Sequence, residues 1–225
     1  DGNKDLFVSN GTRKEINNND YFNKLDKIKI KEDTLLQLSN SIPSEKIENF
    51  IFRNNGNLDF EMANDIWGID YKGFSNGVVY ADLDNDGDLE IITNNIDDKA
   101  SVFKNNSSET NNFVTVNFKS DDENTMGLGN RVYVTTDGVT QVQELTLSRG
   151  FQSSVAPELH FGVGKHTTID EIKVVWNNGK EEIKKNIKSN QKLTFANKEA
   201  TEIATTTTES PRIFTTDTTQ FFPEY

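Results

Sequence analysis

The 225-residue chain contains no cysteine and only two histidines. Without cysteine it can form neither a disulfide framework nor a thiolate metal site, although this leaves its compartment open because many exported bacterial proteins also lack cysteine. His160 ends an expected strand and His166 lies in a polar turn, and neither belongs to a Gly-x-Ser-x-Gly or His-Glu-x-x-His motif. We therefore expect a structural role for His160 and no catalytic site in this chain.

Long apolar runs and excess positive charge are also missing. No apolar run has the length of a transmembrane helix, and no basic amphipathic stripe suggests binding to an anionic membrane surface. The 36 acidic residues outnumber the 24 basic ones, which gives a formal net charge of −12. Nucleic-acid phosphates would be repelled by this charge. We expect neither nucleic-acid binding nor membrane insertion.

The composition favours an all-β fold. Apolar residues make up only 33% of the chain, and Asn, Asp and Thr are abundant, which is typical of short strands joined by polar turns. After residue 110, apolar residues alternate with polar ones, as in strands with one buried face. The alternating positions are Val114–Phe118, Val132–Val134, Leu145–Leu147 and Ile172–Trp176. Asn178-Gly179 is a typical hairpin turn. These patterns predict a β-sandwich or barrel-like domain over residues 111–197.

A dense acidic segment, Asp82-Leu-Asp-Asn-Asp-Gly-Asp-Leu-Glu90, lies between two expected strands. Its alternate positions are all acidic, and carboxylates this close repel one another unless a cation lies between them. Hard oxygen ligands with a glycine at the sixth position suit Ca²⁺. An EF-hand would need a glutamate at the twelfth position, where Thr93 stands. We expect instead a strand–loop–strand calcium site, with Asp82, Asp84, Asp86 and Glu90 binding through side chains and Asp88 through its carbonyl. The alternative is a solvated, metal-free Asn/Asp/Gly turn.

The acidic segment has a partial copy at the start of the chain. Residues 1–10 match residues 86–95 in their Asp-Gly pair, closing acid, apolar strand and asparagine, and residues 51–55 match residues 102–106. Recurrence of a strand–loop–strand unit is typical of β-propeller blades. Because the first copy lacks its first two ligands, we expect the natural N-terminus and any targeting sequence to lie upstream. Whether its Asp1, Asn3 and Asp5 hold an ion stays open.

Two further segments interrupt this pattern. An insertion over residues 15–46 has leucines at partly helical spacing, which favours one or two short helices, although residues 27–31 alternate like a strand. Residues 198–225 are rich in threonine and read as a linker or tail. We therefore expect blade-like repeats over residues 1–110, the second β domain over residues 111–197, and the tail.

Four ordered motifs in the second half resemble the ASPIC/UnbV domain. They are Gly127–Val132, Arg149–Ser153, Leu159–Gly164 and Val174–Gly179. The first half resembles FG-GAP/VCBS repeats, and the pair resembles the cartilage acidic protein family, over residues 1–10 and 48–196. The sequence departs from the family where Asn130 replaces a common alanine and Asn177 a common proline. Glu90 also replaces the commoner aspartate.

The resemblance implies a calcium-stabilised module of a secreted or cell-surface protein. We expect such a module to bind a protein or glycan ligand at the cell surface and to catalyse no reaction. The alternative is an accessory domain of a larger exported enzyme, for example one acting on polysaccharide, whose active site lies outside these residues. A role in secondary-metabolite biosynthesis, which the family name suggests, has no support from a cofactor motif here.

Overall fold

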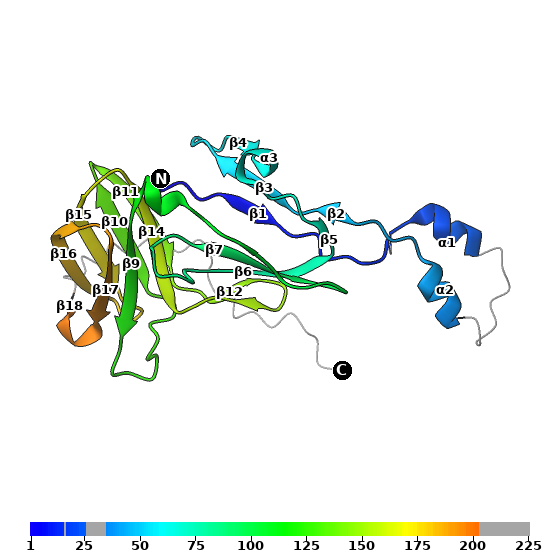
Figure 1. The fold of residues 1–225 in the computed structure, drawn as a ribbon. Coiled ribbons are helices and arrows are strands. Elements are labelled where there is room, and N and C mark those ends of the chain that lie inside the picture. The colour runs from blue at the N-terminus through cyan, green and yellow to red at the C-terminus, as the bar shows by residue number, and fades with distance from the viewer. Residues whose placement is uncertain (16, 26–34, 203–225) are drawn as a thin grey trace, which may run out of the picture.

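The structure is a computed structural model that describes residues 1–15, 17–25 and 35–202. Most of the ordered elements in these ranges are strands, and helices are few and short (Figure 1). The expected all-β class is therefore confirmed, whereas the finer expectation of propeller blades stays a prediction. None of the helices in the described ranges has the length and apolar character needed to span a membrane.

The second half of the chain folds into two sheets packed face to face. One sheet has the strand order β11–β10–β15–β16–β18, and the other has the order β14–β9–β17. Their bounds are β9 Asn112–Lys119, β10 Arg131–Thr136, β11 Val139–Glu144, β14 Glu158–Gly164, β15 Thr168–Val175, β16 Lys180–Lys188, β17 Gln191–Ala196 and β18 Thr201–Glu202. Strands β9 and β17 pair in parallel, and the other pairs in these two sheets are antiparallel. The described strands do not close into a barrel, so this unit is an open sandwich.

The sandwich encloses the larger apolar core of the described residues. The alternating positions expected from the sequence point inward from both sheets, as the period of a strand requires. The buried members are Val114, Val116, Val132, Val134, Leu145, Leu159, Phe161, Val163, Ile169, Ile172, Val174, Trp176 and Phe195. Trp176 is only 3% exposed and makes an edge-to-face contact with Phe118, so it packs in the core as its alternation predicts.

The prediction of a strand at Leu145–Leu147 is wrong. Strand β11 ends at Glu144 and the next strand, β12 (Ser148–Gly150), begins after Leu147. The Leu145 N–H donates to the carbonyl of Asn130, and the Leu145 carbonyl accepts from the Gly129 N–H. Leu145 is buried, but its backbone is bonded to the Gly127–Asn130 turn and not to a neighbouring strand.

The first half of the chain forms smaller sheets. One has the order β1–β3–β4 and another the order β6–β7–β8, while β2 pairs with β5. Their bounds are β1 Leu6–Val8, β2 Ile47–Glu48, β3 Phe50–Asn54, β4 Phe60–Met62, β5 Lys72–Gly73, β6 Ser75–Ala81, β7 Glu90–Asn95 and β8 Ser101–Phe103. The hairpin of β12 and β13 (Ser153–Ser154) lies beside β6, where the Val78 N–H donates to Ser153 Oγ.

The described residues also form a few short helices. Helices α1 (Asn19–Leu25) and α2 (Leu35–Ser41) lie in the insertion and extend away from the sandwich (Figure 1). Helix α3 (Asn64–Trp67) follows β4, and 3-10 turns cover Ser107–Glu109 and Asn197–Glu199. Trp67 is 40% exposed at the end of α3. The alternating residues 27–31 and the tail beyond Glu202 lie outside the described residues.

Candidate metal centre

The acidic loop joins β6 to β7 and bends sharply at Gly87. Asn85 and Gly87 have φ angles of 60° and 93°, in the left-handed region that glycine and asparagine tolerate best. A Cβ built on Gly87 would also lie 1.8 Å from Cε1 of Phe113, which belongs to β9 of the sandwich. Glycine is therefore required at this position both by the backbone angle and by the contact with Phe113.

The fold brings three of the five predicted ligands together. Carboxylate oxygens of Asp82, Asp84 and Asp86 all lie within 4.8 Å of one another. Asp82 is half-buried, and the other two are exposed. Negative charges at this spacing repel unless something neutralises them. The loop geometry therefore suits a cation, and the chemistry of the donors suits a hard one.

Hydrogen bonds within the loop leave two buried carboxylate oxygens without a donor. The Gly87 N–H donates to Asp82 Oδ2 (3.2 Å), and the Asp88 N–H donates to Asp86 Oδ1 (3.1 Å). Ser108 donates from its N–H to Asp88 Oδ2 (2.9 Å). The Oδ1 atoms of Asp82 and Asp88 are buried and accept no hydrogen bond from any described residue. Buried polar atoms in native proteins are normally paired, so these oxygens fit the requirement of a bound cation.

The Glu90 carboxylate closes the loop by accepting hydrogen bonds from backbone N–H groups. This carboxylate, in a side chain only 3% exposed, accepts from the Leu83 N–H (2.9 Å) and from the Asn105 N–H (3.3 Å). It is not one of the three carboxylates that gather within 4.8 Å. Glu90 thus ties the start of the loop to the segment after β8, and its role as a metal ligand stays a prediction.

Asp88 lies in a strongly desolvated position. Burial raises the pKa of this carboxyl, and the nearby charges of Asp86 and Glu90 raise it further, while the hydrogen bond from Ser108 opposes them. The structure places its side chain against Ser108, a residue that the sequence pattern did not identify. The proposed metal contact through the Asp88 carbonyl stays a prediction.

Lys104 supplies the positive charge nearest to Asp84. Its Nζ lies 2.8 Å from Asp84 Oδ2. This hydrogen bond lowers the pKa of Asp84 and raises the pKa of Lys104. Both side chains are largely exposed, so solvent screens the pair. Lys104 offsets one of the crowded charges, and a metal ion that uses this oxygen of Asp84 would have to displace it.

The partial copy at the start of the chain reproduces the closure made by Glu90. The Asn54 N–H donates to Asp5 Oδ1 (2.8 Å), as the Asn105 N–H donates to Glu90 Oε1. The Asn54 side-chain amide donates to the Lys4 carbonyl (3.1 Å), as that of Asn105 donates to the Leu89 carbonyl (3.2 Å). The matching residues found in the sequence therefore make matching hydrogen bonds.

A second pair of asparagines extends this correspondence to the far end of each strand. The Asn10 amide donates to the Glu48 carbonyl (3.0 Å), and the Asn95 amide donates to the Lys99 carbonyl (2.7 Å). Their side chains also converge, because Asn10 Oδ1 accepts from the Ser75 N–H and Asn95 Oδ1 from the Ser75 hydroxyl. At the incomplete loop itself, the Asn3 N–H donates to Asp1 Oδ1 (2.8 Å). No described cluster of three ligands includes Asp1 or Asp5.

The acidic loop is anchored to the sandwich through an aromatic stack. Phe113, which contacts Gly87, stacks on His160 with ring centroids 5.5 Å apart and planes 15° apart. His160 also lies 3.4 Å from the Thr115 hydroxyl through Nδ1. Burial lowers the pKa of His160, although the charges of Asp82, Glu158 and Asp88 oppose this shift. These contacts are consistent with a packing role for His160.

A cleft of about 250 Å³ lies beside the stack. Its lining residues are Asn85, Asp86, Ser108, Asn111, Phe113 and Asn190.

The sandwich carries the region that comparison with protein families identifies. Residues 120–202 match the family model described as ASPIC and UnbV. The match begins directly after β9 and ends with β18. The matched region therefore leaves out β9, which pairs with both β14 and β17 and contains Phe113. No match to a curated protein was found.

Two departures from the ASPIC/UnbV pattern contact each other. The Asn177 N–H donates to the side-chain Oδ1 of Asn130 (2.9 Å), and Asn130 is completely buried. The alanine that the family often has at position 130 would offer no acceptor, and the proline often found at position 177 has no N–H to donate. Neither an alanine at position 130 nor a proline at position 177 could make this hydrogen bond, so each asparagine depends on the other for it.

Proposed function

We propose that this chain is a calcium-binding, non-catalytic module of an exported or cell-surface protein that recognises a protein or glycan ligand. The observation that carries the proposal is the pair of buried, unpartnered oxygens of Asp82 and Asp88 in a loop where three carboxylates gather. Charge of this density needs neutralisation, and a single exposed lysine provides only part of it.

Calcium suits the available donors better than other common metals. The loop offers carboxylate and carbonyl oxygens but no cysteine or histidine ligand, and this excludes typical zinc and copper sites. Calcium accepts irregular sets of about six to eight oxygens, whereas magnesium requires near-ideal octahedral geometry. Asp82, Asp84 and Asp86 would hold the ion by side chains, with Asp88 and Glu90 completing the set. We expect an affinity of roughly 10⁻⁴–10⁻³ M, as in extracellular modules.

The ion would serve to stabilise structure. By neutralising the loop it would hold β6 and β7 together at the end where they approach the sandwich. The contact between Gly87 and Phe113 would pass this constraint to β9. The ion would thereby favour a fixed arrangement of the β6–β7–β8 sheet and the sandwich, in which the polar cleft beside Asp86 becomes a preformed recognition surface.

The same proposal includes the type of repeat that the first half of the chain contains. We infer that β1–β3–β4 and β6–β7–β8 belong to blades of the FG-GAP/VCBS type, and their matching asparagine and carboxylate hydrogen bonds support this inference. Export to the cell surface is supported by the family resemblance, and a site with the affinity of extracellular modules would fill only where calcium is abundant.

Thermal unfolding with and without calcium tests the metal site. An ion that binds only the folded chain must raise the Tm, and saturation at about 100 times Kd corresponds to roughly 2.7 kcal/mol. Asp84→Ala should abolish most of this shift, because it removes one of the three gathered carboxylates. Asp170→Ala, at an exposed position of β15, is the matched control and should keep the full shift.

Three outcomes would count against the site. A wild-type Tm that does not respond to millimolar calcium would remove the metal from the proposal. A shift that survives Asp84→Ala would place the ion elsewhere. An equal shift with magnesium would contradict the choice of calcium.

A further inference from the structure

Lys104 is fixed beside the acidic loop by the backbone around it. It directly follows β8, and the next residue, Asn105, donates from its N–H to Glu90 Oε1 (3.3 Å) and from its side-chain amide to the Leu89 carbonyl (3.2 Å). The base of the lysine side chain is therefore held near the end of the loop, and its Nζ reaches Asp84 Oδ2 (2.8 Å). Within the described ranges, this is the only ion pair that involves a carboxylate of the loop.

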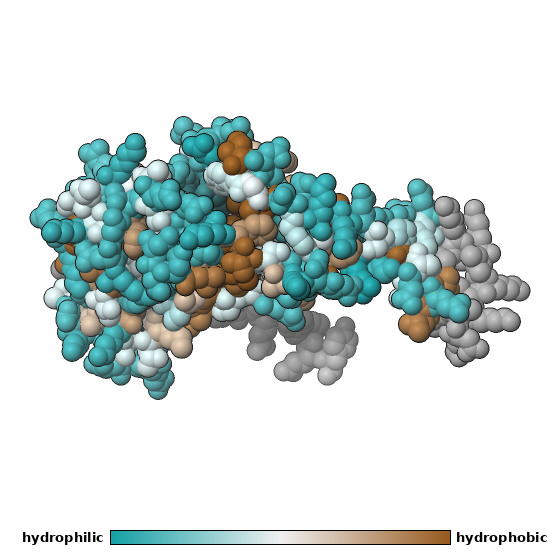
Figure 2. Space-filling view, in the orientation of Figure 1, coloured by the Kyte–Doolittle hydropathy of each residue, from teal (hydrophilic) through white to brown (hydrophobic). Residues whose placement is uncertain are grey.

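The position of Lys104 distinguishes it from other surface lysines. Hydrophilic residues cover much of the face that Figure 2 shows, so an exposed lysine by itself indicates nothing about function. Lys104, however, places its charge on one of the three carboxylates that gather within 4.8 Å. Arg53 occupies the matching position in the partial copy, because residues 51–55 match residues 102–106. A basic residue therefore follows the corresponding strand position in both copies.

The lysine neutralises the loop only in part. An ammonium group has three donors, whereas calcium takes about six to eight oxygens. The Nζ contacts one oxygen of Asp84, and the buried Oδ1 atoms of Asp82 and Asp88 accept no hydrogen bond from any described residue. Exposed ammonium–carboxylate pairs are weak, so this contact depends on the short tether that keeps the amine close to Asp84. An abundant divalent ion can therefore displace the lysine.

We propose that Lys104 is an internal competitor that sets the calcium affinity of the loop. Without calcium, its ammonium group occupies an oxygen of Asp84 that the ion needs, and binding of the ion releases the side chain into solvent. When the ion leaves, the tether returns the amine to Asp84, so the loop always keeps part of its neutralising charge. The role rests on the proposed function, because it requires that the loop bind calcium.

Calorimetric titration of the intact chain with CaCl₂ tests the competition. Lys104→Met keeps much of the side-chain length but removes the charge. It should tighten calcium binding roughly three- to tenfold, because Asp84 is freed and a repelling charge is lost. In urea unfolding with EDTA, the same variant should be less stable than the wild type, because the loop carboxylates lose their paired cation. A lysine with a purely structural role would instead lose stability and calcium affinity together.

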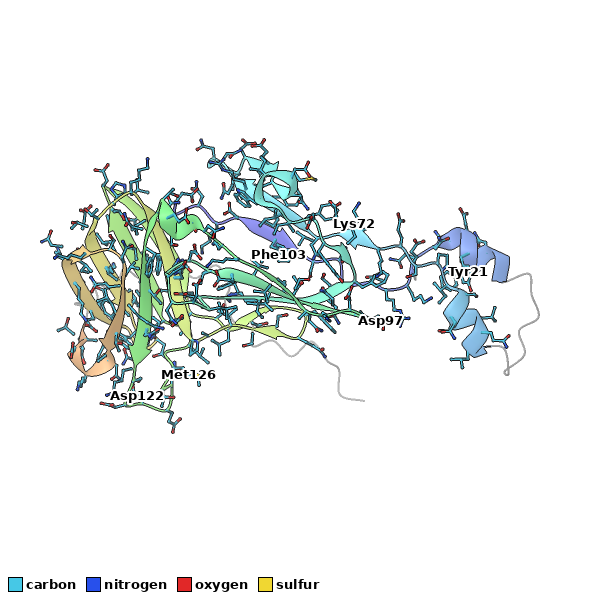
Figure 3. All side chains as sticks on the ribbon, in the orientation of Figure 1. Tyr21, Lys72, Asp97, Phe103, Asp122 and Met126 are labelled. Carbon is cyan, nitrogen blue, oxygen red and sulfur yellow. The ribbon has the colours of Figure 1, made fainter. Side chains whose placement is uncertain are left out.

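Two further variants separate the contact from the charge. Lys99→Met is the matched control, because it removes the same charge from an exposed position in the turn between β7 and β8. Figure 3 shows Asp97, in this turn, at the end of the sheet away from the sandwich, whereas the acidic loop contacts the sandwich through Gly87. Lys99→Met should leave the calcium affinity nearly unchanged. Lys104→Arg keeps the charge and can contact a carboxylate through two donors, so it should bind calcium more weakly than the wild type.

The titrations distinguish the role of Lys104 from the calcium site itself. A wild type that binds no calcium at millimolar concentrations would overturn both. If the wild type binds calcium and Lys104→Met binds it equally well, the competition is wrong and the calcium site stands. Equal tightening in Lys99→Met would assign the effect to net charge and would also overturn the role of Lys104. Circular dichroism verifies folding, and if Lys104→Met does not fold, tighter binding by Lys104→Arg than by the wild type would contradict the competition.

Discussion

The sandwich and the two small sheets are held together by different means. The sandwich encloses a continuous core with residues such as Phe161 and Phe195 that have no exposed surface. The smaller core has Ile51, Ala63 and Ile69 as its buried members, and its sheets depend heavily on asparagine and carboxylate hydrogen bonds. Apolar burial increases stability in proportion to area, whereas each hydrogen bond adds little net free energy. The sandwich therefore has the more complete apolar core, and the small sheets depend more on polar contacts.

Core truncations should show this difference most strongly. Phe161→Ala should lower the free energy of unfolding by about 3–5 kcal/mol, because it opens a cavity in a closed core. Ile51→Ala, in the smaller core, should cost about 2 kcal/mol, near the low end for such changes, because its surroundings can collapse more easily. Urea unfolding of both variants measures these values. Equal losses would contradict the contrast between the two regions.

Substitution of Gly87 should uncouple the two regions. The added methyl of Gly87→Ala would overlap the Phe113 ring and impose a strained positive φ, at a cost of about 1–3 kcal/mol. We expect a lower Tm and a smaller calcium-induced shift. Limited proteolysis should then cut between the sheets and the sandwich more readily.

The double variant Gly87→Ala/Phe113→Ala separates the two effects. Phe113→Ala alone is the reference, because it also removes the stack on His160. Relative to it, the added Gly87→Ala should cost only the backbone strain, and no further loss would show that the backbone angle contributes nothing.

Within the Asn130–Asn177 pair, Asn130→Ala should give the smallest effect. Asn177→Pro alone removes the donor to a buried amide and should cost about 1–3 kcal/mol. Asn130→Ala alone should cost about 1 kcal/mol, because the Asn177 N–H can still reach water. The double variant, which has the alanine and proline that the family resemblance suggests, should be more stable than the sum of the single changes predicts. A double-mutant cycle measured by urea unfolding gives the coupling, and strict additivity would contradict it.

Sequence patterns predicted the sandwich better than the candidate site. The alternation at Val132–Val134 and the turn at Asn178-Gly179 depend only on neighbouring residues in the sequence. The structure contains the first as β10 and the second as the turn of the β15–β16 hairpin. The failure at Leu145–Leu147 has a non-local cause, since Leu145 bonds to the turn at Asn130. Burial alone could not distinguish a strand from an anchored loop.

The acidic spacing identified the three carboxylates that gather, because all of them lie on one short loop. It could not identify the groups that complete their surroundings. Ser108 and Lys104 follow the next strand, and Phe113 comes from the sandwich. Lys104 lies in the repeat that matches residues 51–55, but that pattern does not relate it to the acidic loop, and Ser108 and Phe113 belong to no such pattern. Only the folded chain brings the three to the loop.

The parallel pairing of β9 with β17 has a consequence for the order of folding. Val114 lies opposite Gln191, so this sheet is completed only by residues nearly eighty positions later in the chain. Contacts between such distant segments slow folding because a long loop must first close. During synthesis, one edge of β9 must wait until the strand ending at Ala196 has left the ribosome. A nascent chain shorter than this would present an unpaired, apolar strand edge, and we expect it to be the stage most prone to aggregation.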